Sequence, residues 1–161
     1  MWIAALLIPL LVFGTLAVLS ATSQRPRSLG VRDGLLAPCP DSPNCVSTQA
    51  DREAQRMDAI PLTTNAADAL AVLKQVVSAM PRSQIVTADV NYLHVEFTSR
   101  LFRFVDDVEF FVDDKQHAIH FRSASRAGRS DLGVNRQRMQ AIVSDFQREI
   151  ARHDGSPKTD R

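Results

Sequence analysis

Two histidines and several carboxylates stand at alternating positions in three consecutive segments, as expected where one face of a β-sheet is polar. His94 and Glu96 belong to the first segment, Asp107 and Glu109 to the second, and His120 to the third. If these segments pair, the imidazoles and carboxylates come close enough to bind a metal ion or to transfer protons. Such residues more often form a solvated face, and we expect a solvated face here, with no metal and no cofactor.

A second polar set surrounds Gly128 and Gly133, ahead of a predicted helix. Glycine lets the backbone approach a ligand closely, and the first turn of a helix offers unpaired N–H groups to an anion. Arginine adds bidentate contacts to a carboxylate or phosphate. One hypothesis is therefore a small anionic group, such as a phosphate, a lipid headgroup or a sugar acid. The candidate residues are Arg122, Ser123, Ser125, Arg126, Ser130, Asp131, Asn135 and Arg136.

The alternative for this second set is structural. The arginines would pair with the nearby carboxylates and hold the loop on the sheet, which is the more common role of such charge networks. An aspartate at position 131 could also cap the following helix without any ligand. The carboxylates concerned are Asp106, Asp107, Glu109 and Asp131.

Residues 104–126 position both sets, because apolar and polar residues alternate on either side of a polar turn and so predict a β-hairpin. A slip by one residue would put charges among the apolar side chains, so the pairing should be well defined. We expect a turn centred on residues 114 and 115. On one face it pairs Val112 with His117, Phe110 with Ile119, Val108 with Phe121 and Asp106 with Ser123. On the other face it pairs Phe111 with Ala118, Glu109 with His120 and Asp107 with Arg122.

The flanking residues predict the rest of the fold. Apolar residues at helical spacing follow Asn65, a suitable N-cap, and the pattern stops at Pro81. Segments 85–88 and 92–98 read as strands, and residues 139–150 form a second amphipathic helix. The expected fold is α+β, an antiparallel four-stranded meander covered on one face by two amphipathic helices.

Residues 2–19 contain no charged side chain, so the stretch 1–21 is long enough for a single-pass membrane helix; a cleaved secretory signal is the alternative. The remaining chain divides into a linker at 22–60, an α+β domain at 61–153 and a disordered tail at 154–161. The formal net charge of +1 and the aromatic content of 6% argue against nucleic acid as a partner.

Cys39 and Cys45 are the only cysteines, and they flank a short, proline-rich loop. We expect a structural disulfide there, since the spacing is not Cys-x-x-Cys and no second Cys/His pair has metal-ligand spacing. A disulfide indicates an oxidising, periplasmic or lumenal compartment. Arg25, Arg27 and Arg32 after the apolar stretch favour the opposite orientation, because basic residues tend to stay cytoplasmic.

Three ordered blocks, at 39–46, 104–110 and 122–136, resemble the signature blocks of an uncharacterised family, domain of unknown function fourteen ninety-nine. The resemblance spans about residues 35–150. It implies the limits of the domain and favours an exported location, but it implies no established activity. Arg129 departs from the family pattern, in which an aromatic or other uncharged residue is expected.

Two functions from different classes follow. The first is a membrane-tethered, non-enzymatic binding or assembly module that meets a small anionic ligand or a protein partner. The second is a hydrolase or metal-dependent enzyme that uses the polar sheet face. The sequence contains no Gly-x-Ser-x-Gly or phosphate-loop motif, and it leaves open whether the protein is an enzyme.

Overall fold

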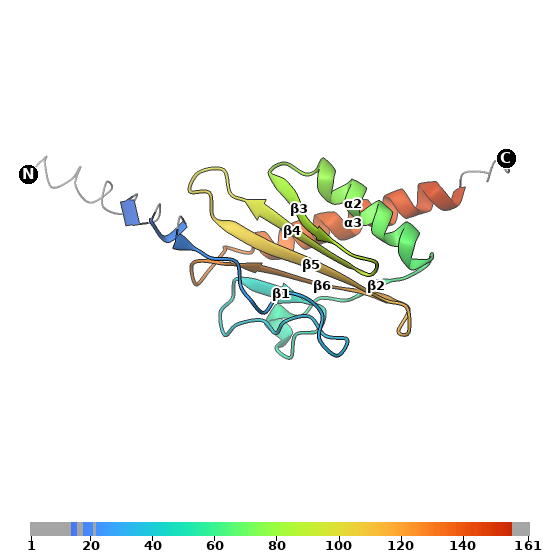
Figure 1. Cartoon of the computed structure of the whole chain (residues 1–161), viewed down its shortest axis with the longest axis horizontal. Helices are drawn as coiled ribbons and strands as arrows, with labels where there is room; N and C mark the ends of the chain where they lie inside the picture. Colours follow the sequence, from blue (N-terminus) through green and yellow to red (C-terminus); the bar gives the residue numbers. More distant parts are fainter. Residues whose placement is uncertain (1–13, 16–17, 21, 156–161) are drawn as a thin grey trace, which may run out of the picture.

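The computed structural model describes residues 14–15, 18–20 and 22–155. It is an α+β domain built on one antiparallel sheet with strand order β1-β6-β5-β4-β3, in which β2 also pairs with β6 (Figure 1). The strands are β1 Cys45–Ser47, β2 Ile60–Pro61, β3 Ser83–Ala88, β4 Tyr92–Thr98, β5 Val105–Asp113 and β6 Ala118–Ser125; the helices are the short 3-10 helix η1 Glu53–Gln55, α2 Ala66–Ala79 and α3 Val134–Gly155.

The four consecutive strands β3 to β6 form the predicted meander, and α2 and α3 pack on it (Figure 1). Asn65 caps α2 as predicted, because its side chain accepts a hydrogen bond from the N–H of Asp68. The core lies between the sheet and the two helices. Its largest fully buried apolar side chains come from both layers: Phe110, Phe121, Leu73, Leu93, Ile119, Met139 and Ile142.

Strand β1 lies within residues 22–60, which were predicted to be a linker, and β2 spans the predicted boundary between that linker and the domain. Both pair with the outer edge of β6, β1 opposite residues 122–124 and β2 opposite residues 118–119. They extend the sheet because Val46 and Ile60 are buried in the main core. Isolated apolar residues in a polar stretch carry no periodic signal, so these short strands had no pattern to predict them.

The predicted hairpin register is wrong by two residues. Glu109 lies opposite Arg122, where the sequence analysis placed His120, and Phe110 lies opposite Phe121. The turn is wider than expected because the Asp113 carboxylate accepts hydrogen bonds from the N–H groups of Lys115 and Gln116. A two-residue shift keeps every side chain on its face, since the strand repeat is two, so the apolar and polar faces were predicted correctly.

The polar face of the sheet, lined by residues 92, 94, 96, 107, 109, 120, 122 and 126, is not solvated as we had expected. Asp107 exposes 1% of its surface and Glu109 none. Residues 25–36, which we call the strap, contact this face: the N–H of Gly30 donates to Glu109, and Arg25 pairs with Glu96. The sheet is therefore covered on both faces.

The predicted membrane helix at 1–21 falls mostly outside the described residues. Within the part of the chain that the structure describes, no helix has both the length and the apolar character needed to span a bilayer. The predicted tail at 154–161 also falls largely outside them.

Candidate functional site

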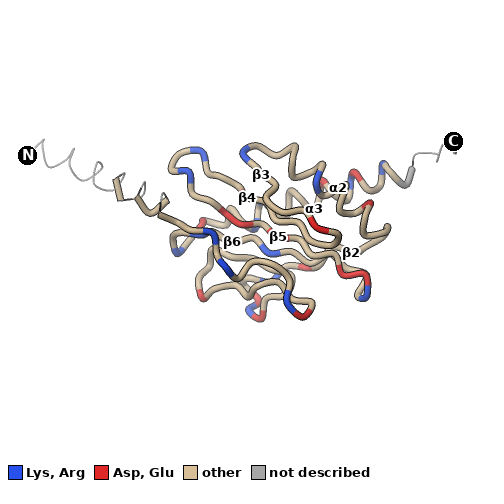
Figure 2. The backbone as a smooth tube through the Cα atoms, viewed as in Figure 1, with Lys and Arg blue, Asp and Glu red and all other residues tan. Residues whose placement is uncertain are grey.

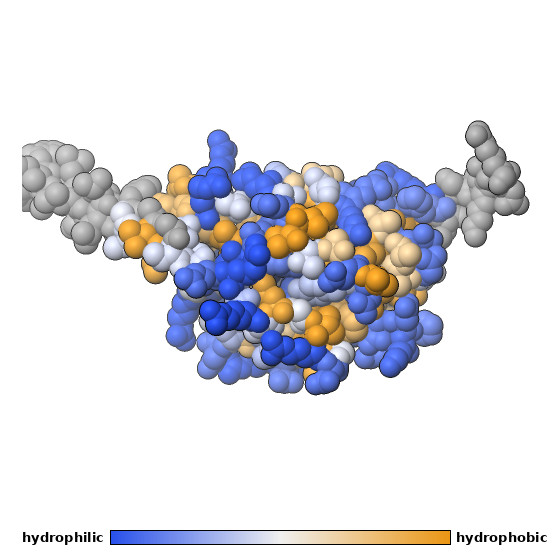
Figure 3. Space-filling model, in the orientation of Figure 1, coloured by the Kyte–Doolittle hydropathy of each residue, from blue (hydrophilic) through white to orange (hydrophobic). Residues whose placement is uncertain are grey.

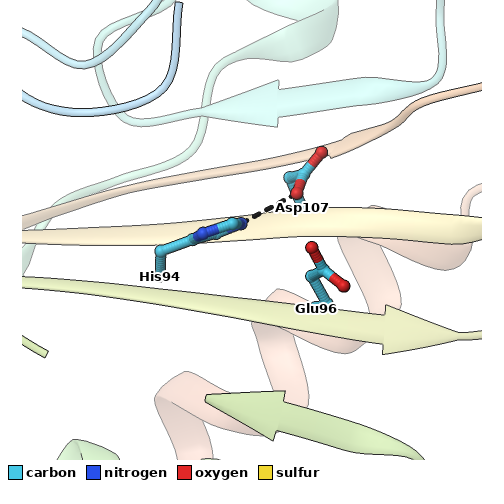
Figure 4. A group of neighbouring side chains, drawn as sticks. All are labelled: His94, Glu96 and Asp107. Atoms are coloured by element: carbon cyan, nitrogen blue, oxygen red, sulfur yellow. Dashed lines mark hydrogen bonds and ion pairs between the residues drawn. The ribbon is translucent and has the colours of Figure 1, made fainter. Parts of the chain in front are cut away.

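The candidate site lies on the polar face, where β4 and β5 place their ionisable residues side by side. Pairing sets Glu96 opposite Asp107 and His94 opposite Glu109. His94 then reaches diagonally, and its Nε2 lies 2.8 Å from Oδ1 of Asp107 (Figure 4). Because both side chains are almost completely buried, this pair is shielded from solvent and from screening by salt.

Arg126, just beyond the end of β6, completes this group. Its Nε donates to Asp107 Oδ2 at 2.8 Å and its second NH2 group donates to Asp107 Oδ1 at 2.6 Å. The same NH2 group also pairs with Oε1 of Glu96, and Arg25 of the strap donates to that same oxygen. A bidentate guanidinium forms charge-assisted hydrogen bonds to a carboxylate, which are stronger than those between neutral groups.

These contacts shift the pKa values of all three groups. Burial alone would raise the pKa of Asp107, but the hydrogen bonds from Arg126 and His94 outweigh it and lower the pKa. Burial would likewise raise the pKa of Glu96, but the hydrogen bonds from Arg126 and Arg25 outweigh burial and lower it. The hydrogen bond to Asp107 raises the pKa of Arg126 above its already high ordinary value. The site thus holds two carboxylates in the charged form.

His94, Glu96 and Asp107 also have the donor types of a metal site, with ligand atoms within 4.8 Å of one another (Figure 4). The guanidinium of Arg126 contacts both carboxylates and supplies a positive charge to them. A divalent ion bound to the same oxygens would repel that guanidinium and would have to displace it. The arrangement therefore favours an internal ion pair over a metal centre.

Glu109 belongs to a separate group. Its Oε1 accepts hydrogen bonds from the hydroxyl of Tyr92 and from the N–H of Gly30, both at 2.8 Å, and its Oε2 lies 3.4 Å from Arg122. Burial, followed by the charge of Glu109, raises the pKa of Tyr92 well above its ordinary value. Tyr92 and Gly30 were not among the sequence candidates, because nothing in their local pattern points to a partner across the fold.

His120 is also apart from His94. Its Nδ1 lies 3.1 Å from the hydroxyl of Thr48, and its ring stacks on Phe111 with a centroid separation of 6.3 Å. The five residues predicted to share the polar face thus lie on that face, but they fall into three groups. The structure brings His94 and Glu96 together with Asp107, and it gives Glu109 and His120 other partners.

We predict that His120 makes stability fall in mild acid. Burial lowers its pKa below the ordinary value of 6.5, despite the opposing charge of Asp113. Because the unfolded chain then binds a proton that the folded chain resists, the free energy of unfolding should decrease as the pH drops below about 6.5. Urea unfolding across this range should show a shallower decrease for His120→Phe. The same change at the exposed His153 is the control, and an unaltered slope in His120→Phe would contradict the prediction.

The loop that was predicted to bind an anion is organised around Asn135, which is fully buried. Its amide nitrogen donates to the backbone oxygen of Asn44, to Ser125 and to Asp131, and its oxygen accepts from Ser123 and Arg138. One side chain therefore joins the disulfide loop, β6 and the start of α3.

Asp131 caps α3 as predicted, since its carboxylate accepts from the N–H groups of Gly133 and Asn135. These are the N–H groups that an anion would otherwise use. Ser130 accepts from the N–H of Leu132, and Arg136 donates to backbone oxygens of η1 and the residue after it. Anion binding by the full predicted set thus stays a prediction, and most of its members already have protein partners.

Arg138 is not among the candidate anion-binding residues, but it is one of the arginines around this loop that were expected to pair with the nearby carboxylates. It donates to Asp106 at 2.6 Å and to Asn135 at 2.7 Å, and its guanidinium lies 4.8 Å from the ring centre of Phe97. Its place three residues after Asn135 on the helix could have suggested the second contact. The contacts with β4 and β5 depend on tertiary packing.

The predicted disulfide between Cys39 and Cys45 is present. It closes the loop that contains Asn44, whose side chain donates to the backbone oxygen of Gly128 at 2.7 Å.

We predict that the Cys39→Ser/Cys45→Ser variant loses about 2 kcal/mol of unfolding free energy, because the unfolded chain gains conformational freedom when the ring is open. Chemical denaturation measures this loss. Added reductant should destabilise the parent to the same extent and leave the variant unchanged; a reductant effect on the variant would contradict the assignment.

The fold and the paired interior charges define a small α+β domain in which the described ionisable groups of the polar face mainly contact one another. The chain belongs to the DUF1499 family of proteins of unknown function, whose sequence profile matches residues 35–146. This match confirms the resemblance that the three sequence blocks suggested. No curated protein and no solved structure matches the chain.

Proposed function

We propose that this chain is a membrane-tethered, non-enzymatic binding module, and that the β6–α3 loop, residues 126–133, contacts an anionic group. The supporting observation is the contrast within this loop. Arg126 and Asp131 are turned to protein partners, whereas Arg129 is exposed. The paired residues hold the backbone, and Arg129 is left to meet a ligand.

The loop is preorganised for this role. Gly128, Leu132 and Gly133 have positive φ angles of 84°, 54° and 81°, and the oxygen of Gly128 is held by Asn44. A loop fixed in this way loses little conformational entropy when it binds, which favours affinity. The buried groups around Asn135 are thus positioning residues, and Arg129 is the group we expect to touch the anion.

The placement in the membrane rests on separate support. The uncharged stretch at 1–21 favours a single-pass anchor, and the disulfide favours a periplasmic or lumenal domain. A reporter fused after Arg161 tests the orientation. We expect activity from a fused reporter that functions only after export. If only a reporter that functions in the cytoplasm is active, the domain lies on the cytoplasmic side and the proposed orientation is wrong.

The enzyme alternative has less support in the geometry. It needs His94, His120, Glu109 and Asp107 to act together, but these residues are buried and belong to three groups. A metal assay on the purified chain tests it directly. Stoichiometric, tightly bound metal that is lost in His94→Ala would favour the alternative over the binding module.

The test of the binding module compares Arg129→Gln with Lys115→Gln, an exposed cation in the β5–β6 turn. Thermal unfolding of the full chain in neutral detergent is followed with inorganic phosphate against sodium chloride of equal ionic strength. Phosphate stabilises many proteins without binding, so the parent and both variants are compared at each concentration. Bound phosphate should raise the unfolding midpoint of the parent and of Lys115→Gln by mass action. The unfolding midpoint of Arg129→Gln should rise less. Equal shifts in all three proteins would refute the proposal.

A further inference from the structure

Three loops meet at one end of the sheet. The backbone N–H of Arg126 donates to the backbone oxygen of Val105, and this bond joins the β6–α3 loop to the start of β5. The backbone N–H of Thr98 donates to the backbone oxygen of Arg82, and this bond joins the end of β4 to the turn before β3. The β4–β5 loop, residues 99–104, lies between them. Figure 1 shows that the N-terminal segment leaves the domain from this same end.

Apolar side chains are exposed on these loops. Leu101 exposes 71% of its surface and Leu132 exposes 90%. Leu132 also adopts a left-handed backbone conformation with a φ of 54°, which a leucine rarely does. An apolar side chain held away from the core by an unfavourable backbone has no evident role in folding, and it is suited to contact with a partner.

Exposed arginines surround these leucines: Arg82, Arg100, Arg103 and Arg129. The carboxylates at this end do not offset them, because Asp106, Asp107 and Glu96 are paired internally and Asp131 caps α3. Figure 2 shows basic positions on the β4–β5 loop, and Figure 3 shows hydrophobic atoms among hydrophilic ones at this end of the molecule. The end therefore combines positive charge with exposed apolar groups.

The strap places this end near the predicted anchor. Arg25 donates to Glu96 at 2.8 and 2.6 Å, close to where β4 ends, so the chain between the apolar N-terminal stretch and the domain is short and tied down. A domain held in this way must carry its three loops close to the bilayer that receives the anchor. This follows only if the membrane tether of the proposed function is right.

We propose that the arginine–leucine surface, formed by Arg82, Arg100, Leu101, Arg103, Arg129 and Leu132, rests on the anionic phospholipid surface of the membrane. The leucines enter the boundary between headgroups and acyl chains, and the arginines pair with lipid phosphates. The inference rests on the proposed function and deepens it, because it names the anion as a lipid headgroup. Each surface arginine should strengthen docking about fivefold.

Hydrogen–deuterium exchange tests this surface on the full chain in nanodiscs of phosphatidylcholine alone or with phosphatidylglycerol. Amides of residues 99–104 and 127–133 should exchange more slowly when phosphatidylglycerol is present, and added salt should reverse the slowing. The turn at 113–118 and residue 90, which lie at the opposite end, should show no difference. Exchange that is identical in the two lipids, or slowing that is uniform over the domain, overturns the proposal.

Two variants separate docking from folding. Leu132→Gly suits the left-handed backbone, so its unfolding midpoint should equal or exceed that of the parent while the lipid-dependent protection is lost. Arg100→Gln should weaken protection about fivefold. Protection that survives both variants would show that Leu132 and Arg100 do not contact the lipid, and would overturn the proposal.

The phosphate experiment distinguishes the two proposals. If phosphate recognises Arg129 in detergent but phosphatidylglycerol gives no protection, the anion is a free solute and only the lipid surface fails. If phosphatidylglycerol protects the loops and free phosphate does not bind, a single anion is insufficient and the surface acts as a whole. In that case the lipid surface stands, and the single-anion contact of the proposed function fails.

Discussion

The Arg126→Met variant should lose about 3–5 kcal/mol of unfolding free energy, the cost of breaking a buried ion pair by removing one partner. Methionine keeps much of the side-chain volume of arginine but lacks the guanidinium that pairs with Asp107 and Glu96. Two neighbouring carboxylates then remain without their shared counter-charge. Equilibrium unfolding in urea near neutral pH measures the loss.

The matched control is Arg148→Met, which removes an arginine from an exposed pair with Asp145 on α3. Such pairs contribute less than about 1 kcal/mol, so this variant should resemble the parent. Equal effects of the two substitutions would show that the buried network is not what stabilises the sheet.

In Arg126→Met, the contribution of Asp107 to the pH dependence of stability should be opposite in sign to its contribution in the parent. In the parent, Asp107 has a lowered pKa, so its contribution is present above the ordinary value of 3.8 and is lost as the pH falls through the folded pKa. Without the guanidinium, burial should raise the pKa of Asp107. Protonation of Asp107 should then remove the unpaired charge and stabilise the variant. The difference in stability between parent and variant should therefore shrink toward acid pH. A difference that is constant with pH would contradict this account.

The Glu109→Leu variant should show a loss of similar size, about 3–5 kcal/mol. Its carboxylate is completely buried, and its removal leaves Arg122 charged and unpaired inside the protein. The hydroxyl of Tyr92 and the N–H of Gly30 lose their acceptor as well. Urea unfolding again gives the magnitude, with Glu53→Leu as the control at an exposed position.

A second substitution separates the charge from the hydrogen bonds. In Glu109→Leu/Arg122→Leu the unpaired charge is gone, so part of the stability should return, whereas the groups of Tyr92 and Gly30 still lack an acceptor. Trypsin provides an independent measurement, because the strap contains Arg27 and Arg32. Cleavage there should be faster in both variants than in the parent. An unchanged cleavage rate would mean that the contact at Gly30 does not hold the strap.

Local patterns in the sequence were sufficient for the elements and their faces. The alternation of Val108, Phe110 and Val112 marks the buried side of a strand, and the spacing of apolar residues after Asn65 marks a helix with its cap. Both signals depend on neighbours within a few residues, which is why the antiparallel meander and the packing helices were predicted. The proline-rich loop between Cys39 and Cys45 is similarly local, and its disulfide was predicted.

The hairpin register and the partners of the polar residues required the tertiary structure. Either register places Glu109 and Arg122 on the polar face, so alternation cannot choose between them, and the choice was made by the wider turn at Asp113. The same holds for the site. His94, Glu96 and Asp107 were visible as donors, but the arrival of Arg126 and Arg25 turned a possible metal site into an internal ion-pair network. Glu96 and Arg25 are 71 residues apart, and a contact over that distance leaves no periodic trace in the chain.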